Sequence, residues 1–511
     1  MSQSLSRREF IGSSVVVAAG LAAGAPARGN SVSVIVRAPD GKPLDATRLK
    51  TFIARDLAND PLPLEFSPAD GRCEIPVGGE PFQLACRLEV PGFGEVYCYA
   101  DNGGHGYSRP ATVDFVADAA RTRYRRVHEA ARQEKAACSG DEVFARHLKA
   151  AGGRVRDTAS AYEALAHGLH AGERLTLDAA RRRIARLPGP RRDLLFGAMY
   201  GRNHGPDYER RFAEAFNFAT ISWYIWNKNA EPEAERIDYG RMDATTQWCA
   251  DHGVAAKGFG YVYLTRGAMP EWLRDWPYEK LLAEYERVVA QTTRRFAGRW
   301  RCVEVINEAH DVSNIMRYSH GQLLELTRAA CRAARRGAPK LDRLINNCCL
   351  WSEHAKRRNA DGSRRWSAYR YLADCIANGV EFERIGLQLY YPEQDLFEIE
   401  RMLDRFKVFG RRLHISEVGC NSEPGLDPTC ARPKDDVPGW HGPWTEAMQA
   451  DWAEALFTIC YSKPEFEAVG WWDLADYDGH FWPHGGLLHK DGSPKESYAR
   501  LLALKKSWGL V

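Results

Sequence analysis

The chain has 511 residues, of which 44% are hydrophobic and 27% charged, which predicts a folded protein of two or three domains and excludes disordered and collagen-like chains. Its 70 lysines and arginines against 67 aspartates and glutamates leave a net charge of +3, so the charge balance does not favour a nucleic-acid partner. The 15 tryptophans offer flat apolar faces of the kind that bind sugars.

Residues 1–27 are expected to form an export signal outside the fold. Arg7 and Arg8 precede an apolar run at residues 15–23, and Ala25 and Ala27 supply small side chains for cleavage. The pattern resembles a twin-arginine signal and predicts a periplasmic or secreted protein. The run is shorter than the roughly 20 residues that cross a bilayer, so no membrane partner is expected. The alternative is a cytoplasmic protein with a basic start.

Two regions with different sequence patterns follow. Residues 31–110 contain short alternating runs separated by turns, which predicts a small β-sandwich that either binds carbohydrate or braces the rest of the protein. Residues 111–190 are rich in Ala, Arg and Glu and show no strand pattern from Val113 onward, which predicts a helical connector with a solvated face of arginines.

Residues 191–511 alternate between short β-rich runs and long amphipathic stretches, which predicts a (β/α)8 TIM barrel. A doubly wound open sheet is the structural alternative, but no glycine-rich phosphate loop follows the first strand. Helices are expected at residues 278–296, 322–335, 395–409 and 444–461. The eight expected strands are residues 194–198, 218–222, 254–258, 302–306, 344–347, 385–389, 413–416 and 468–472.

Two glutamates occupy the position where a barrel carries its catalytic groups. Glu308 follows the fourth expected strand and Glu417 the seventh. A single glutamate at a strand end is more often a cap or an ion-pair partner, but strands four and seven face each other across the barrel mouth. Two carboxyl groups placed there are able to flank one glycosidic bond. The pair therefore predicts glycoside hydrolysis.

Several segments in the same order resemble glycoside hydrolase family 10, the endo-β-1,4-xylanase family. They are residues 195–198, 300–309, 386–388 and 415–417, and the closing stretch at residues 485–488 and 493–498. The resemblance covers the chain from about Asp193 onward. It implies a retaining, endo-acting β-1,4-glycosidase that hydrolyses xylan-type polysaccharide or its oligosaccharides by double displacement without a cofactor.

The resemblance also assigns roles to individual residues. Glu417 would be the nucleophile, Glu308 the general acid/base, and Asn307 a hydrogen-bond donor to the sugar 2-hydroxyl. Glu417 then has to be ionised while Glu308 holds a proton, so the site has to separate the two pKa values, and repulsion between the carboxylates supplies part of that separation. His310 lies close to Glu308 in sequence and is a weaker candidate.

The expected sugar-binding residues depart from the family pattern. Residues 222–226 lack its lysine, residues 257–263 lack both of its histidines, and Tyr390 stands where the family has histidine. These departures indicate a divergent branch with a rebuilt binding shell. Trp471 and Trp472 are read either as stacking platforms or as packing. The candidate substrate-binding residues are Asn307, Lys257, Gln388, Tyr390, Trp471, Trp472, Trp226 and Tyr224.

Other readings remain open. One alternative is the same chemistry on a different β-glycan, and another is a barrel that binds carbohydrate without turnover. We expect a monomer that binds no metal, because the histidines among Asp476, Asp478, His480, His484 and His489 are spaced as in a solvated loop. The 13 cysteines cannot all pair. Those at positions 73, 86, 98, 420 and 430 are either disulfide candidates or buried thiols.

Overall fold

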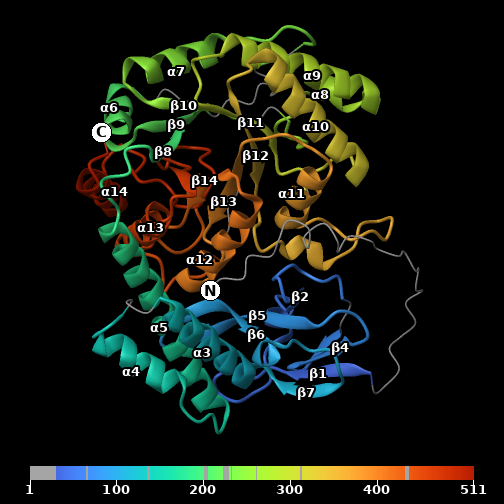
Figure 1. The fold of residues 1–511 in the computed structure, drawn as a ribbon, viewed down its shortest axis with the longest axis vertical. Helices are drawn as coiled ribbons and strands as arrows, with labels where there is room; N and C mark the ends of the chain where they lie inside the picture. Colours follow the sequence, from blue (N-terminus) through green and yellow to red (C-terminus); the bar gives the residue numbers. More distant parts are fainter. Residues whose placement is uncertain are drawn as a thin grey trace.

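The computed structural model describes residues 30–64, 67–134, 138–200, 205–221, 230–231, 233–259, 262–310, 313–431 and 437–510. The expected export signal, Tyr224 and Trp226 lie outside the described residues. Figure 1 shows the barrel at one end of the molecule and the earlier strands and helices, drawn from blue to green-cyan, at the other.

Eight parallel strands close into a barrel in chain order, because β15 pairs with β8. The closure confirms the predicted (β/α)8 fold and excludes the open sheet. Nearly every residue of these strands is buried, as expected for parallel strands covered on both faces. The strands are β8 (Leu195–Tyr200), β9 (Phe218–Ile221), β10 (Ala255–Gly258), β11 (Cys302–Asn307), β12 (Asp342–Asn347), β13 (Arg384–Tyr390), β14 (Arg412–Gly419) and β15 (Phe466–Trp471).

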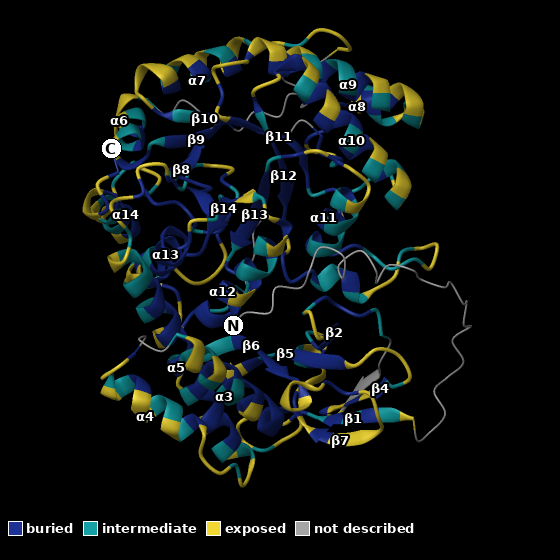
Figure 2. Ribbon diagram, in the orientation of Figure 1, coloured by how far each residue is buried: buried dark blue, intermediate teal, exposed yellow. Residues whose placement is uncertain are grey.

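Amphipathic helices surround the strands, and their outer faces are exposed while the barrel interior is buried (Figure 2). Their ends follow local sequence signals: Ser319 and Gln322, for example, form a capping box that starts α10. The helices are α6 (Pro206–Ala215), α7 (Gly240–Asp251), α8 (Glu271–Arg274), α9 (Tyr278–Arg295), α10 (His320–Gly337), η2 (Glu353–Lys356), α11 (Ala368–Ala377), α12 (Leu396–Arg405), η3 (Phe406–Phe409), α13 (Glu446–Tyr461) and α14 (Glu496–Ser507).

The N-terminal region contains two sheets. The first has the order β3-β4-β1-β7 and the second β2-β5-β6. Strand β7 runs parallel to β1 and lies beyond residue 110, where the sequence predicted no further strand. The strands are β1 (Ser31–Ile35), β2 (Ile53–Asp56), β3 (Ser67–Ala69), β4 (Arg72–Pro76), β5 (Phe82–Val90), β6 (Gly94–Ala100) and β7 (Ala111–Asp114), with the short helices α2 (Ala46–Leu49) and η1 (Asn102–Gly104).

The second sheet is buried on both faces. One face, which includes Leu84 and Val96, shares a core with the first sheet and with helices α3 (Phe115–Gln133) and α5 (Thr158–Ala185). The other face, which includes Tyr97 and Tyr99, belongs to the core of the barrel. Each fully buried apolar side chain contributes about 1.5–3 kcal/mol to the free energy of folding. Because both faces of the sheet carry such side chains, the sheet forms a layer that belongs to both cores.

Three helices join the sheets to the barrel, namely α3, α4 (Glu142–Ala151) and α5. The expectation of a solvated arginine face is wrong for two residues of α3, because the side chains of Arg123 and Arg126 are only 4% and 8% exposed. All 13 cysteines are thiols, and all but Cys349 are buried. Among the described residues, no helix is both long enough and apolar enough to span a membrane.

Candidate active site

Glu308 and Glu417 lie close to the carboxyl ends of β11 and β14. Glu308 directly follows β11, and its backbone has φ of 51°, a left-handed conformation that is uncommon for a residue other than glycine. Its N–H donates to the carbonyl oxygen of Asn346 at 3.1 Å. Glu417 lies inside β14, which continues to Gly419 and is therefore longer than the sequence predicted. A strained conformation held by neighbouring strands is typical of functional positions.

Three neutral donors hold the half-buried carboxylate of Glu308. Tyr263 Oη donates to Oε2 at 2.7 Å, and Ser313 Oγ donates to the same oxygen at 2.9 Å. Gln388 Nε2 donates to Oε1 at 2.8 Å. The donors come from the loop after β10, the loop after β11 and strand β13, so three neighbouring segments fix this carboxyl group.

Glu417 is 4% exposed and is also held by neutral donors. Asn346 Nδ2 donates to Oε1 at 2.9 Å, and Tyr390 Oη donates to Oε2 at 2.7 Å. Burial and the negative charges of Glu304 and Glu308 raise the pKa of Glu417 well above its ordinary value, while Tyr390 and Lys257 act in the opposite direction. The carboxylate of Glu417 is therefore a stronger base than an exposed glutamate.

Hydrogen bonds connect the two glutamates through three amides. Asn307 Oδ1 accepts from Asn346 Nδ2 at 3.1 Å and from Gln388 Nε2 at 3.3 Å. Gln388 also binds Glu308, and Asn346 also binds Glu417. Register brings these groups together, since Asn307 pairs with Asn346 and Gln388 with Glu417. The network holds both carboxyl groups in one arrangement before substrate arrives.

A buried ion pair lies in the barrel interior. Lys257 and Glu304 are both 0% exposed, and Lys257 Nζ donates to Glu304 Oε2 at 3.1 Å. Burial raises the pKa of Glu304 to about 7, against the lowering effect of Lys257. Lys257 was expected to bind substrate, but its full burial leaves it no exposed surface for a sugar. Its charge acts to lower the pKa of Glu417.

The two predicted tryptophans differ in their surroundings. Trp471 is fully buried, and its Nε1 donates to the carbonyl oxygen of Gly485 at 2.8 Å, so its ring has no face open to a sugar and the packing interpretation applies. Trp472 is 5% exposed and packs with Met199 and Phe259 in a small cluster separate from the main core. The cluster lies next to Tyr390.

Tyr390 also stacks on Trp482, with ring centroids 5.1 Å apart and an interplanar angle of 20°. This contact supports the ring whose hydroxyl donates to Glu417.

Two further sequence candidates lie elsewhere. The ring of His310 contacts the carbonyl oxygen of Cys348 at 3.1 Å and stacks near Tyr371. The loop expected to be solvated contains a fully buried His480, 2.8 Å from Asp427, so that expectation is wrong for His480. No group of three or more His, Cys, Asp or Glu side chains among the described residues has a geometry that could hold a metal ion.

Four residues of the site were not predicted: Tyr263, Ser313, Asn346 and Glu304. Asn346 and Glu304 lie inside strands that were correctly located, and a polar residue in a buried strand is a signal that could have marked them. Tyr263 and Ser313 lie in loops, and no periodic pattern identifies them.

Comparison with known proteins places this geometry in a family. The model of glycosyl hydrolase family 10 matches residues 192–503. Endo-1,4-beta-xylanase B from Thermotoga neapolitana is 23% identical over 309 residues, which cover 57% of this chain and 82% of that protein. Endo-1,4-beta-xylanase 2 from Arabidopsis thaliana is 21% identical over 310 residues, covering 59% of this chain and 26% of that protein.

Among solved structures, native xylanase 10B from Thermotoga maritima is similar with a TM-score of 0.49 and 20% identity, covering 62% of this chain and 97% of that one. The family match spans the barrel from its first strand to its last helix. The chain belongs to glycosyl hydrolase family 10 and is a xylanase-like glycoside hydrolase.

Proposed function

We propose that the protein is a retaining, endo-acting β-1,4-glycosidase that hydrolyses xylan-type polysaccharide, with Glu417 as nucleophile and Glu308 as general acid/base. The observation that carries the proposal is the pair of strand-end glutamates joined through Gln388, Asn307 and Asn346. The xylan assignment rests on family membership and on the activity named for the two xylanase relatives.

In the first step, Glu417 attacks the anomeric carbon while Glu308 gives its proton to the departing glycosidic oxygen. The glycosidic bond breaks, and an ester bond forms between the sugar and Glu417. In the second step, Glu308 removes a proton from water, the water oxygen attacks the anomeric carbon, and Glu417 leaves as a carboxylate. Both glutamates return to their starting protonation states.

The hydrogen bonds of each carboxyl group suit these roles. Tyr390 and Asn346 both donate to Glu417 and stabilise its anionic form without neutralising it. The half-buried Glu308 lies at the more accessible end of the network, where a leaving group and then a water molecule must reach it.

Asn307 is suited to bind the sugar. Its Oδ1 already accepts two hydrogen bonds, and within the described part of the chain no oxygen accepts from its Nδ2. The Nδ2 group is therefore a donor for a sugar hydroxyl beside the anomeric carbon. A hydrogen bond to the 2-hydroxyl that strengthens in the transition state accelerates glycoside hydrolysis.

Proton NMR of freshly formed product tests the mechanism. The enzyme should release the β-anomer first from xylan oligosaccharides, because two inversions at one carbon cancel. An α-anomer formed first would overturn the retaining assignment. A panel of β-glycans assayed in parallel tests the substrate, and a rate on glucan that exceeds the rate on xylan would overturn the xylan assignment.

We also propose that the protein is exported and acts as a monomer. Export is supported by Arg7 and Arg8 ahead of an apolar run. Changing both to lysine should leave the precursor in the cytoplasm, as measured by fractionation. Unchanged export would contradict a twin-arginine route.

A further inference from the structure

The N-terminal region contacts the barrel at the face that carries the glutamates. Arg55 Nη1 donates to the carbonyl oxygen of Trp351, in the loop after β12, at 2.7 Å. Gly94 forms a β-bridge with Trp440, in the loop between β14 and α13. Both loops follow the carboxyl ends of barrel strands, the end at which TIM barrels carry their active sites.

A third contact is with the loop between β13 and α12. Four consecutive residues of this loop and of the start of α12 bind the N-terminal region. The N–H of Tyr97 donates to the carbonyl oxygen of Glu393 at 2.9 Å. Tyr99 Oη donates to Gln394 Oε1 at 3.0 Å. The N–H of Leu396 donates to Glu173 Oε1 at 3.1 Å.

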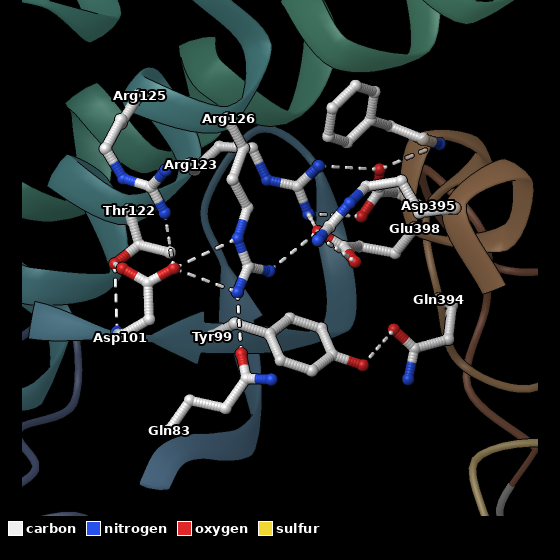
Figure 3. A network of polar contacts seen from close by, with 12 residues as sticks. Gln83, Tyr99, Asp101, Thr122, Arg123, Arg125, Arg126, Gln394, Asp395 and Glu398 are labelled. Atoms are coloured by element: carbon white, nitrogen blue, oxygen red, sulfur yellow. Dashed lines mark hydrogen bonds and ion pairs between the residues drawn. The ribbon is translucent and has the colours of Figure 1, made fainter. Parts of the chain in front are cut away.

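Asp395 forms the strongest of these contacts. Arg123 donates two parallel hydrogen bonds to its carboxylate, at 3.0 and 2.6 Å, and Asp395 is 0% exposed. A bidentate pair of this kind fixes both distance and angle. Figure 3 shows Arg123 and Arg126 of α3 reaching side by side toward Asp395 and Glu398.

Arg126 ties this ion pair to the second sheet. It donates to Glu398 at 3.1 Å, to Gln83 at 2.6 Å and to Asp101 at 3.0 Å (Figure 3). The start of α12 is therefore bonded through arginines to a strand, a loop and a helix that come from a different part of the chain.

The other end of the same segment holds the catalytic groups. Gln388 and Tyr390 are in β13 and donate to Glu308 and Glu417, respectively. Tyr391 is 2% exposed, and its N–H donates to the carbonyl oxygen of Gly419 at 2.9 Å. Only residues 391–394 separate Tyr390 from Asp395, and each end of this stretch is anchored.

We propose that the N-terminal region positions Gln388 and Tyr390, which donate to the two glutamates, through its hydrogen bonds and ion pair with the loop between β13 and α12. Arg123 and Tyr99 are the positioning residues. The inference rests on the proposed roles of Glu308 and Glu417. The face of the second sheet that carries Tyr97 and Tyr99 packs on the barrel, so that face is not available to a carbohydrate ligand.

Two mild substitutions test the proposal. Tyr99→Phe removes one hydroxyl. Arg123→Lys keeps the positive charge but cannot donate two parallel hydrogen bonds to the carboxylate of Asp395. Their matched controls are Tyr162→Phe, whose hydroxyl donates to Arg37 within the N-terminal region, and Arg121→Ala, an exposed residue of α3. All four variants are made in the full chain, and unfolding midpoints are recorded for each.

The kinetic readout is kcat and KM on an aryl β-xylobioside. We expect kcat to fall about threefold in Tyr99→Phe and about tenfold in Arg123→Lys with little change in KM, the pattern of a lost transition-state interaction. The controls should match the wild type. Equal kcat in all five proteins would overturn the proposal, even if the unfolding midpoints of the two test variants fall.

A second readout does not depend on activity. Hydrogen exchange of the peptide covering residues 388–396 should accelerate in Arg123→Lys and Tyr99→Phe and not in the controls. Unchanged exchange in these two variants would overturn the proposal. A wild-type enzyme with no glycosidase activity would contradict the proposed function, and hydrogen exchange would still decide whether the N-terminal region holds this loop.

Discussion

The carboxyl groups at the barrel mouth and those at the interface with the N-terminal region accept hydrogen bonds from different kinds of donor. At the barrel mouth, Glu308 and Glu417 accept hydrogen bonds from tyrosine, asparagine, glutamine and serine side chains. At the interface with the N-terminal region, Asp395 and Glu398 accept from arginines. The first arrangement surrounds negative charge with dipoles, and the second neutralises it.

The pKa values of Glu398 and Glu417 reflect this difference, whereas burial raises the pKa of Asp395 to about 6 against the lowering effect of Arg123. Burial raises the pKa of Glu398, but Arg401, Arg126 and Arg123 outweigh burial and hold it at about 2. Burial and the charges of Glu304 and Glu308 raise the pKa of Glu417 well above its ordinary value, and its donors Asn346 and Tyr390 are neutral. A permanently ionised carboxylate suits a structural contact, whereas a basic carboxylate with neutral donors suits a group that must form and break a bond.

The largest expected effect is the loss of activity when the nucleophile at the barrel mouth is replaced. Glu417→Gln should lower the rate on an aryl β-glycoside by at least about 10,000-fold, because a removed nucleophile has no substitute. Its unfolding midpoint should be unchanged or raised, since burial and the charges of Glu304 and Glu308 disfavour the charged form of the carboxyl group that is removed.

Glu398→Gln is the matched variant at the interface. It removes the carboxylate that pairs with Arg401, while Arg123 keeps Asp395 and Arg126 keeps Asp101. The lost charged hydrogen bonds should lower the free energy of unfolding by about 1.5–3 kcal/mol, with at most about a tenfold loss of rate. Rates and denaturant unfolding of both variants would be measured together. Similar losses of rate in both would remove the distinction between the two regions.

Glu308→Ala should have the next largest effect, and its size should depend on the leaving group. General acid catalysis contributes about 100- to 10,000-fold, so natural oligosaccharides should lose about that much rate. Aryl glycosides with acidic phenols need no proton and should lose far less in the first step. Added azide should restore their turnover, and equal losses for both substrate types would exclude Glu308 as the acid.

Tyr390→Phe tests the neutral donors themselves. A hydrogen bond to a charged group is worth about 1.5–3 kcal/mol, which predicts a loss of roughly 10- to 100-fold in kcat/KM. Tyr390 lowers the pKa of Glu417, so its removal raises that pKa further, and the acidic limb of the pH profile should move to higher pH. A limb that stays in place would show that this hydroxyl does not control the ionisation of Glu417.

The barrel could be predicted because its pattern is local. Parallel strands buried on both faces appear as short apolar runs, and seven of the eight predicted strands begin and end within two residues of the observed ones, while β14 extends three residues further. Glu308 and Glu417 followed from strand order, because the carboxyl ends of barrel strands meet at one rim.

The residues that orient the glutamates could not be predicted in the same way. Asn346 is important because it lies between Asn307 and Glu417, a relation that exists only once the barrel closes. Arg123 and Arg126 were assigned to solvent because a helix rich in arginine resembles a surface helix when its neighbours are unknown. Trp471 shows the converse, since an aromatic residue near the site is buried as packing.

The smallest expected effect concerns a single ion pair near the interface. His441 Nε2 lies 2.7 Å from Glu173 Oε2. Burial lowers the pKa of His441, but the hydrogen bond and the charge of Glu173 outweigh burial and raise it. A histidine whose pKa is raised in the folded state stabilises the protein fully at pH values below its unfolded-state pKa of about 6.5. That stabilisation is lost as the pH rises through the folded-state pKa.

His441→Gln should therefore destabilise the protein at pH 6, by at most about 1 kcal/mol because the side chain is partly exposed, and should have a smaller effect at pH 9. The pKa of Glu173 is lowered, although burial acts to raise it, so its contribution is present above its unfolded value and is lost only as pH falls through its lower folded value. His252→Gln, whose ring contacts a backbone oxygen at the end of α7, is the control. Denaturant unfolding at the two pH values decides: an effect of His441→Gln that is equal at both, or larger at pH 9, would mean that the pair is not ionic in the folded protein and that the arginines alone supply the charge contacts of this interface.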